Sequence, residues 1–128
     1  MTDFDWVTAR SKCSLGVLFE VLKAELQEDV DKRMALFGGA PSNFGFRIAS
    51  SNNSVSVLLE GIGVRDSVVF QLTATAIEVK DRSGALKLSA TPTLNDNGEC
   101  RLKINGEEKE LWHLRKIALE ELFFRAYS

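Results

Sequence analysis

The sequence predicts an α+β fold: a curved antiparallel β-meander of six or seven strands, flanked by a long N-terminal and a C-terminal amphipathic helix. Apolar residues recur every three or four positions near both ends of the chain, which is the helical period. Between residues 44 and 110 the apolar period is two, and turn residues separate the runs. With no helical pattern between the strands, neighbours in sequence pair as antiparallel neighbours. We expect residues 1–128 to form one domain, because a chain of this length buries a sizeable core.

The N-terminal helix follows Asp3 or Asp5 as an N-cap and ends before Gly38 and Gly39. One face carries Leu15, Leu18, Leu22, Leu26, Val30, Met34 and Phe37. A continuous helix of this extent would be roughly 48 Å long. A compact domain of this size is only roughly 36 Å across. We therefore expect either a break between Ser11 and Gly16, or a projecting end whose stripe another subunit covers.

The strand region alternates apolar and polar side chains, which places one face on a core and the other in water. Expected strands cover 44–48, 55–59, 68–72, 77–79, 86–90 and 100–104. Asn105-Gly106 predicts a two-residue hairpin turn that leads to a short last strand over 107–110. The C-terminal helix should run from about Trp112 to Tyr127, and its wide apolar arc predicts that it packs in the core.

Charge is mixed along the whole chain and sums to −2. No segment has the basic excess that binding to a phosphate backbone or an anionic membrane surface requires, so we expect no nucleic acid or membrane partner. The longest apolar run, Leu15 to Phe19, is too short to span a bilayer. The acidic start of the chain does not resemble a signal peptide. These features predict a cytoplasmic protein.

The cysteines are Cys13 in the helical stretch and Cys100 on an inward strand position. The two cysteines are far apart in sequence, and we expect the chain in the cytoplasm. We therefore interpret them as two buried reduced thiols. A disulfide or a reactive thiol is the alternative.

Chemistry-bearing residues are sparse. His113 is the single histidine, so it is the first candidate for acid–base catalysis. Glu60 and Asp66 flank a glycine-rich bend and form the second candidate, as a carboxylate pair. One histidine and two distant cysteines cannot make a common zinc site, and the lone Gly61-Ile62-Gly63 is a weak phosphate signal. We expect no cofactor and no metal.

Three functions remain open. The first is a non-catalytic protein–protein interaction module that forms a homodimer, because the N-terminal helix is too long for the domain; its expected interface residues are Trp6, Leu26, Val30, Met34 and Phe37. The second is a module that binds a small apolar ligand between helices and sheet. Its expected pocket residues are Phe44, Phe46, Phe70, Trp112, His113 and Leu122. The third is an enzyme that uses His113 or the Glu60/Asp66 pair.

Overall fold

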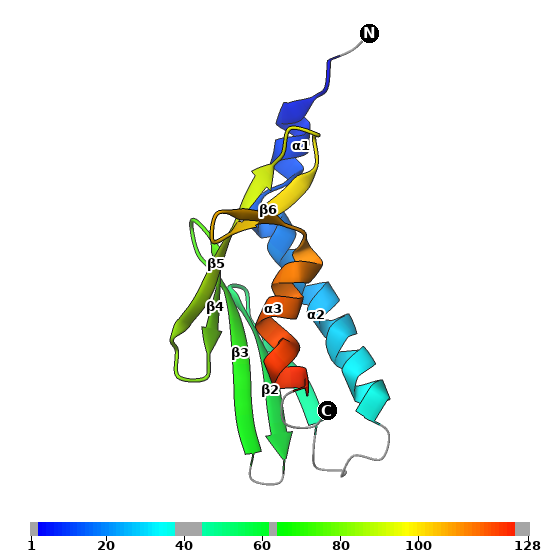
Figure 1. Cartoon of the computed structure of the whole chain (residues 1–128), viewed down its shortest axis with the longest axis vertical. Helices are drawn as coiled ribbons and strands as arrows, with labels where there is room; N and C mark the ends of the chain where they lie inside the picture. Colours follow the sequence, from blue (N-terminus) through cyan, green and yellow to red (C-terminus); the bar gives the residue numbers. More distant parts are fainter. Residues whose placement is uncertain (1–2, 38–44, 62–63, 125–128) are drawn as a thin grey trace.

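The computed structural model describes residues 3–37, 45–61 and 64–124, with the side chains of Phe37 and Val64 outside this description. The elements in chain order are α1 (Trp6–Lys12), α2 (Leu15–Phe37), β1 (Gly45–Ser50), β2 (Ser54–Gly61), β3 (Val64–Leu72), β4 (Ile77–Asp81), β5 (Leu86–Leu94), β6 (Cys100–Ile104), β7 (Glu107–Lys109) and α3 (Leu111–Phe124). The described part of the chain therefore has the predicted α+β architecture (Figure 1).

The sheet is a seven-stranded antiparallel meander in which every strand pairs with its neighbour in sequence. In this register Val57 lies opposite Val68, and Phe70 lies opposite Val79. All four side chains are buried, as the alternation of apolar and polar residues predicts. The Asn105-Gly106 turn between β6 and β7 has positive φ angles of 53° and 81°, the backbone of a tight hairpin turn.

Helices α2 and α3 lie side by side against the sheet and form a helical layer (Figure 1). α2 packs on β1, β2, β3 and β5, and α3 packs on β3 and β6. The core lies between the two layers and includes Leu22 and Leu26 of α2, Val57 and Phe70 of the sheet, and Leu114 of α3. The inward apolar side chains of the strands pack there on the apolar faces of the helices, which explains why both patterns are visible in the sequence.

The N-terminal helix is broken where we expected a break. Cys13 ends α1, with its N–H donating to the carbonyls of Ala9 and Arg10, and Ser14 leads into α2, with its carbonyl accepting from Leu18 N–H at 2.9 Å. The 23 residues of α2 then span about 34 Å, which fits the domain. α1 buries no residue and projects at one end of the molecule, so the expected break resolves the length conflict and leaves a short projecting helix (Figure 1).

The interpretation of Cys13 and Cys100 as reduced thiols is wrong. The two sulfurs form a disulfide that joins the α1–α2 junction to the start of β6. The break in the helix brings Cys13 against the sheet, where the Cα atoms of the two cysteines are 5.4 Å apart. The expected cytoplasmic location therefore loses the support that two reduced thiols would have given it. Within the described ranges, none of the helices combines the length and the hydropathy that a membrane span requires.

α3 is not enclosed by the core around its whole apolar arc. Leu114, Ala118 and Leu122 face the sheet and are buried. Ile117 and Phe124 are about half exposed. α3 lies on one face of the sheet, so only the side chains directed toward the sheet or α2 are covered.

Candidate functional site

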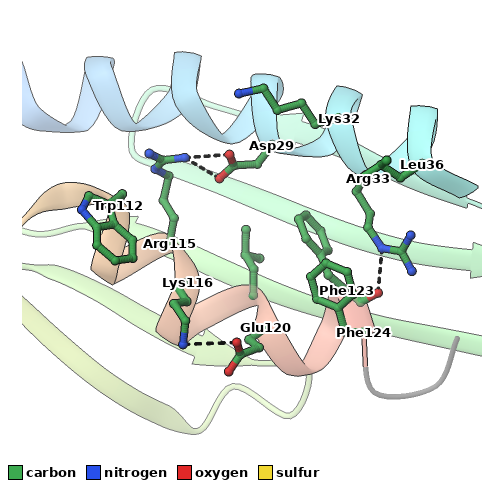
Figure 2. Close-up of a pocket in the computed structure, with 11 residues that line it drawn as sticks. Asp29, Lys32, Arg33, Leu36, Trp112, Arg115, Lys116, Glu120, Phe123 and Phe124 are labelled. Atoms are coloured by element: carbon green, nitrogen blue, oxygen red, sulfur yellow. Dashed lines mark hydrogen bonds and ion pairs between the residues drawn. The ribbon is translucent and has the colours of Figure 1, made fainter. Parts of the chain in front are cut away.

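The seam between α2 and α3 contains an open groove of about 360 Å³, which we call the α2–α3 groove (Figure 2). α2 contributes Asp29, Lys32, Arg33 and Leu36, and seven residues of α3 between Trp112 and Phe124 complete the lining. The two helices run in the same direction, because Arg115 near the start of α3 faces Asp29, and Phe123 near its end faces Arg33. The lining therefore follows both helices toward their C-terminal ends.

Arg115 joins the two helices at the end of the groove that lies near the start of α3. Its Nη1 donates to both carboxylate oxygens of Asp29, at 2.7 and 2.6 Å (Figure 2). Its Nη2 lies 2.8 Å from a carboxylate oxygen of Glu25. Glu25 and Asp29 are four residues apart, so one face of α2 directs both carboxylates toward α3. The cation is mostly buried and shared between two anions, which gives Arg115 a structural role.

Arg33 occupies the other end of the groove and is 6% exposed. Its Nε donates to the carbonyl of Phe123 at 2.8 Å, where the last turn of a helix leaves carbonyls without helical partners. The guanidinium also lies over the ring of Phe124, 4.7 Å from its centroid. Arg33 thus provides a hydrogen-bond donor for a carbonyl in the last turn of α3. It also places its positive charge over the ring of Phe124.

The rim of the groove is apolar and exposed. The side chain of Leu36 is 76% exposed, that of Trp112 48% and that of Phe124 47%. Charged residues stand among them: Lys116 pairs with Glu120 at 3.2 Å, one turn along α3. The lining carries four cations and two carboxylates, and Glu25 beside it adds a third carboxylate that pairs with Arg115, so the groove has a formal charge of +1. This groove suits a partner that is apolar and negatively charged.

The residues expected to form an apolar pocket divide into two groups. Phe46 and Phe70 are buried in the core, and Phe46 packs edge-to-face on Phe123 with 4.9 Å between ring centroids. Leu122 is also buried and borders a second, polar hollow of about 390 Å³ between α3 and β3. Among the described members of this set, Trp112 alone lines the α2–α3 groove. Phe44 lies outside the described residues.

His113 is half-buried, and its ring stacks on the neighbouring Trp112 with 3.7 Å between centroids. Its Nδ1 is buried without a hydrogen-bond partner among the described residues. The backbone N–H of His113 donates to the carbonyl of Glu110 in the first turn of α3. The imidazole belongs to the start of α3 and is not part of the groove lining.

Glu60 and Asp66 both border a hollow of about 200 Å³ at the β2–β3 hairpin, but strand alternation directs their side chains to opposite faces of the sheet. Asp66 lies opposite Leu59, whose side chain is buried on the inner face, so Glu60 next to Leu59 points to the outer face. There Glu60 pairs with Arg47 at 2.7 Å, and this hydrogen bond holds the pKa of Glu60 below its usual value. Asp66 borders the polar hollow between α3 and β3. In the part of the chain that the structure describes, no group of His, Cys, Asp and Glu could hold a metal ion.

The expected interface residues are also separated. Leu26 and Val30 are buried under the chain's own sheet, so the interface cannot use these two side chains. Met34 is partly exposed and lies against Gly45 of β1. Trp6 is exposed on α1, at the far end from the groove. The side chain of Phe37 lies outside the described residues.

Sequence reasoning missed Arg33, Leu36, Arg115 and Phe124 as site residues. One signal was present for Arg33, because it continues the buried stripe three residues after Val30, and a cation at such a position marks a buried polar contact. The pairing of Arg115 with Asp29 spans 86 positions and has no local signal. No family model matches the sequence, and comparisons with curated proteins and with solved structures find no similar protein.

Proposed function

We propose that the chain is a non-catalytic protein–protein interaction module that forms a homodimer through the apolar surface around the α2–α3 groove. The observation that carries the proposal is the cluster of large apolar side chains on the helical layer. Leu36, Trp112 and Phe124 border the groove, and Ile117, on the same helix as Trp112 and Phe124, is 50% exposed. Large exposed apolar side chains with charged residues among them are typical of an interaction site.

Several features support a second copy as the partner. The formal net charge is only −2, so two copies repel each other weakly. Both signs of charge occur around the groove, with Lys32 on α2 and Glu120 on the outer side of α3. A two-fold axis perpendicular to the helices turns the helical layers antiparallel and can bring opposite charges together twice. Arg115 already pairs with Glu25 and Asp29, and Lys116 pairs with Glu120, so these charges are engaged in the fold, which supports binding rather than catalysis.

Sedimentation equilibrium tests the proposal. The wild-type chain should associate reversibly, and Phe124→Ser together with Ile117→Ser should raise the dimer dissociation constant at least about tenfold, because apolar surface leaves the interface. Leu86→Ser on β5 is the matched control: Leu86 is similarly exposed and is not part of the groove lining. A wild-type chain that remains monomeric, or a dimer that both sets of substitutions affect equally, would contradict the proposal.

A second candidate is a small apolar ligand with a negatively charged head. The volume of the groove lies within the range of small-molecule sites, and its cations could hold a carboxylate. Laurate is a suitable probe. If it binds the wild-type chain and competes with dimer formation, the ligand hypothesis gains support. If it binds Phe124→Ser as well as the wild type, the groove is not its site.

A further inference from the structure

The segment from Asp3 to Val7, which we call the N-terminal arm, includes the N-cap and the first residues of α1 and lies at the opposite end of the helical layer from the C-terminal ends of α2 and α3 (Figure 1). Its apolar side chains are poorly covered: Trp6 is 62% exposed and Val7 57%. Two large apolar side chains exposed to solvent at a projecting end are typical of a binding surface. Tryptophan in particular is enriched at the energetic centres of interfaces.

The arm is held in place although it is exposed. Asp5 caps α1, accepting from the N–H of Thr8 at 3.1 Å and from its hydroxyl at 2.7 Å. The ring of Phe4 lies against Gly98 of the β5–β6 turn, so closely that a Cβ at Gly98 would be 2.8 Å from it. The disulfide at Cys13 fixes the end of α1 to β6. A fixed arm loses less conformational entropy when it binds than a free segment would.

The arm and the α2–α3 groove are complementary. Asp3 and Asp5 give the arm a charge of −2, and the hydrogen bond from the Thr8 N–H lowers the pKa of Asp5, which keeps it ionised at neutral pH. With Glu25, which pairs with Arg115, the groove has a formal charge of +1, and its Lys32 has no ion-pair partner among the described residues. The exposed Asp3 and Trp6 of the arm therefore match a groove that combines the cation of Lys32 with exposed apolar side chains.

An arm cannot reach the groove of its own chain, because the groove follows the C-terminal half of α2 and the arm precedes its N-terminal end. α2 alone measures about 34 Å over its 23 residues, and the disulfide prevents the arm from folding back along it. Another copy, turned antiparallel, presents its groove to the arm. The same two-fold rotation places the second arm in the first groove, so the exchange is reciprocal and closed.

We propose that the N-terminal arm of each copy occupies the α2–α3 groove of the other copy. This inference rests on the proposed homodimer and names the element that fills its interface. Trp6 would enter the apolar part of the groove beside Phe124, and Asp3 would face Lys32.

A charge exchange in the full-length chain, read by sedimentation equilibrium at low salt, tests the inference. Asp3→Lys and Lys32→Glu should each raise the dimer dissociation constant about tenfold, and the double variant should recover most of the loss, because the attraction is restored with reversed signs. Lys103→Glu on β6 and Asp96→Lys in the β5–β6 turn are the matched controls. Each should change the dimer dissociation constant by less than about threefold. Trp6→Ser should weaken the dimer as strongly as Phe124→Ser.

The outcomes separate the two proposals. A wild-type dimer that depends on Phe124 but tolerates Trp6→Ser and both charge reversals would overturn the role of the arm and leave the proposed homodimer intact. If both single charge variants lose dimer affinity and the double variant does not recover it, the pairing of arm and groove would also be overturned. A wild-type chain that is monomeric at every concentration would overturn both.

Discussion

Cys13 and Cys100 are bonded to each other across 87 positions of sequence, and this bond links the junction of the two N-terminal helices to the start of β6. Cys13 is fully buried at the point where α1 ends and the chain turns into α2. The disulfide therefore determines how α1, and with it the exposed Trp6, is presented at the end of the molecule.

Removal of this disulfide should destabilise the fold. The cross-link closes a long loop in the unfolded chain, and we expect its reduction to lower the free energy of unfolding by about 2–4 kcal/mol. Urea unfolding with and without reductant measures the change. A Cys13→Ala/Cys100→Ala double variant is the control, and its unfolding midpoint should not respond to reductant. An equal midpoint for the oxidised and reduced wild-type chain would contradict the prediction.

Arg115 should contribute more to stability than any exposed ion pair. Arg115→Met leaves Glu25 and Asp29 facing each other without their shared cation, which should cost about 1–3 kcal/mol. The control is Lys116→Met on the same helix, whose pair with Glu120 is exposed and should contribute about 0–0.5 kcal/mol. Similar losses for the two variants in chemical unfolding would show that the Arg115 pairs do not hold the helices together.

Leu26 should behave as a core residue. Leu26→Ala removes a fully buried side chain and should lower the free energy of unfolding by about 2–5 kcal/mol. The dimer dissociation constant, measured under conditions in which the variant is folded, should not change. Val21→Ala on the exposed side of α2 should alter stability by less than about 0.5 kcal/mol. Weakened dimerisation of Leu26→Ala without loss of stability would place this residue at an interface after all.

The fold should lose stability in acid through carboxylates that accept hydrogen bonds. Asp81 accepts from the hydroxyl of Ser83 at 2.6 Å and from the N–H groups of Ser83 and Ala85, and these bonds lower its pKa. A pKa that is lower in the folded state adds stability above the unfolded value of about 3.9, and the gain disappears as the pH falls through the folded pKa.

Asp81→Asn removes this titrating group, so its unfolding free energy should fall less steeply than that of the wild type as the pH decreases below about 5. Urea unfolding at a series of acidic pH values provides the comparison. Asp5 and Glu99, whose pKa values are also lowered by hydrogen bonds, should retain part of the acid sensitivity in the variant. Parallel pH profiles for the two proteins would contradict the prediction.

The local pattern of the sequence was sufficient for the sheet and for the helix break. Alternation through residues such as Val55 and Val57, and the Asn105-Gly106 turn, act over a few positions, so strand order and register follow from them. The groove depends on how two helices pack, and its contacts, such as Arg33 to Phe123 and Arg115 to Asp29, join residues about 90 positions apart. Periodicity says which face of a helix is apolar, but not how much of that face a neighbour covers, so the exposure of Phe124 could not be predicted.

Association of two copies is the central claim, and the molecular mass from small-angle X-ray scattering over a concentration series tests it most directly. At the highest concentrations we predict twice the 14.2 kDa of the chain, with a particle whose two helical layers lie antiparallel. The Phe124→Ser/Ile117→Ser variant should scatter as a single chain under the same conditions. A constant mass of 14.2 kDa for the wild-type protein across the series would contradict the account.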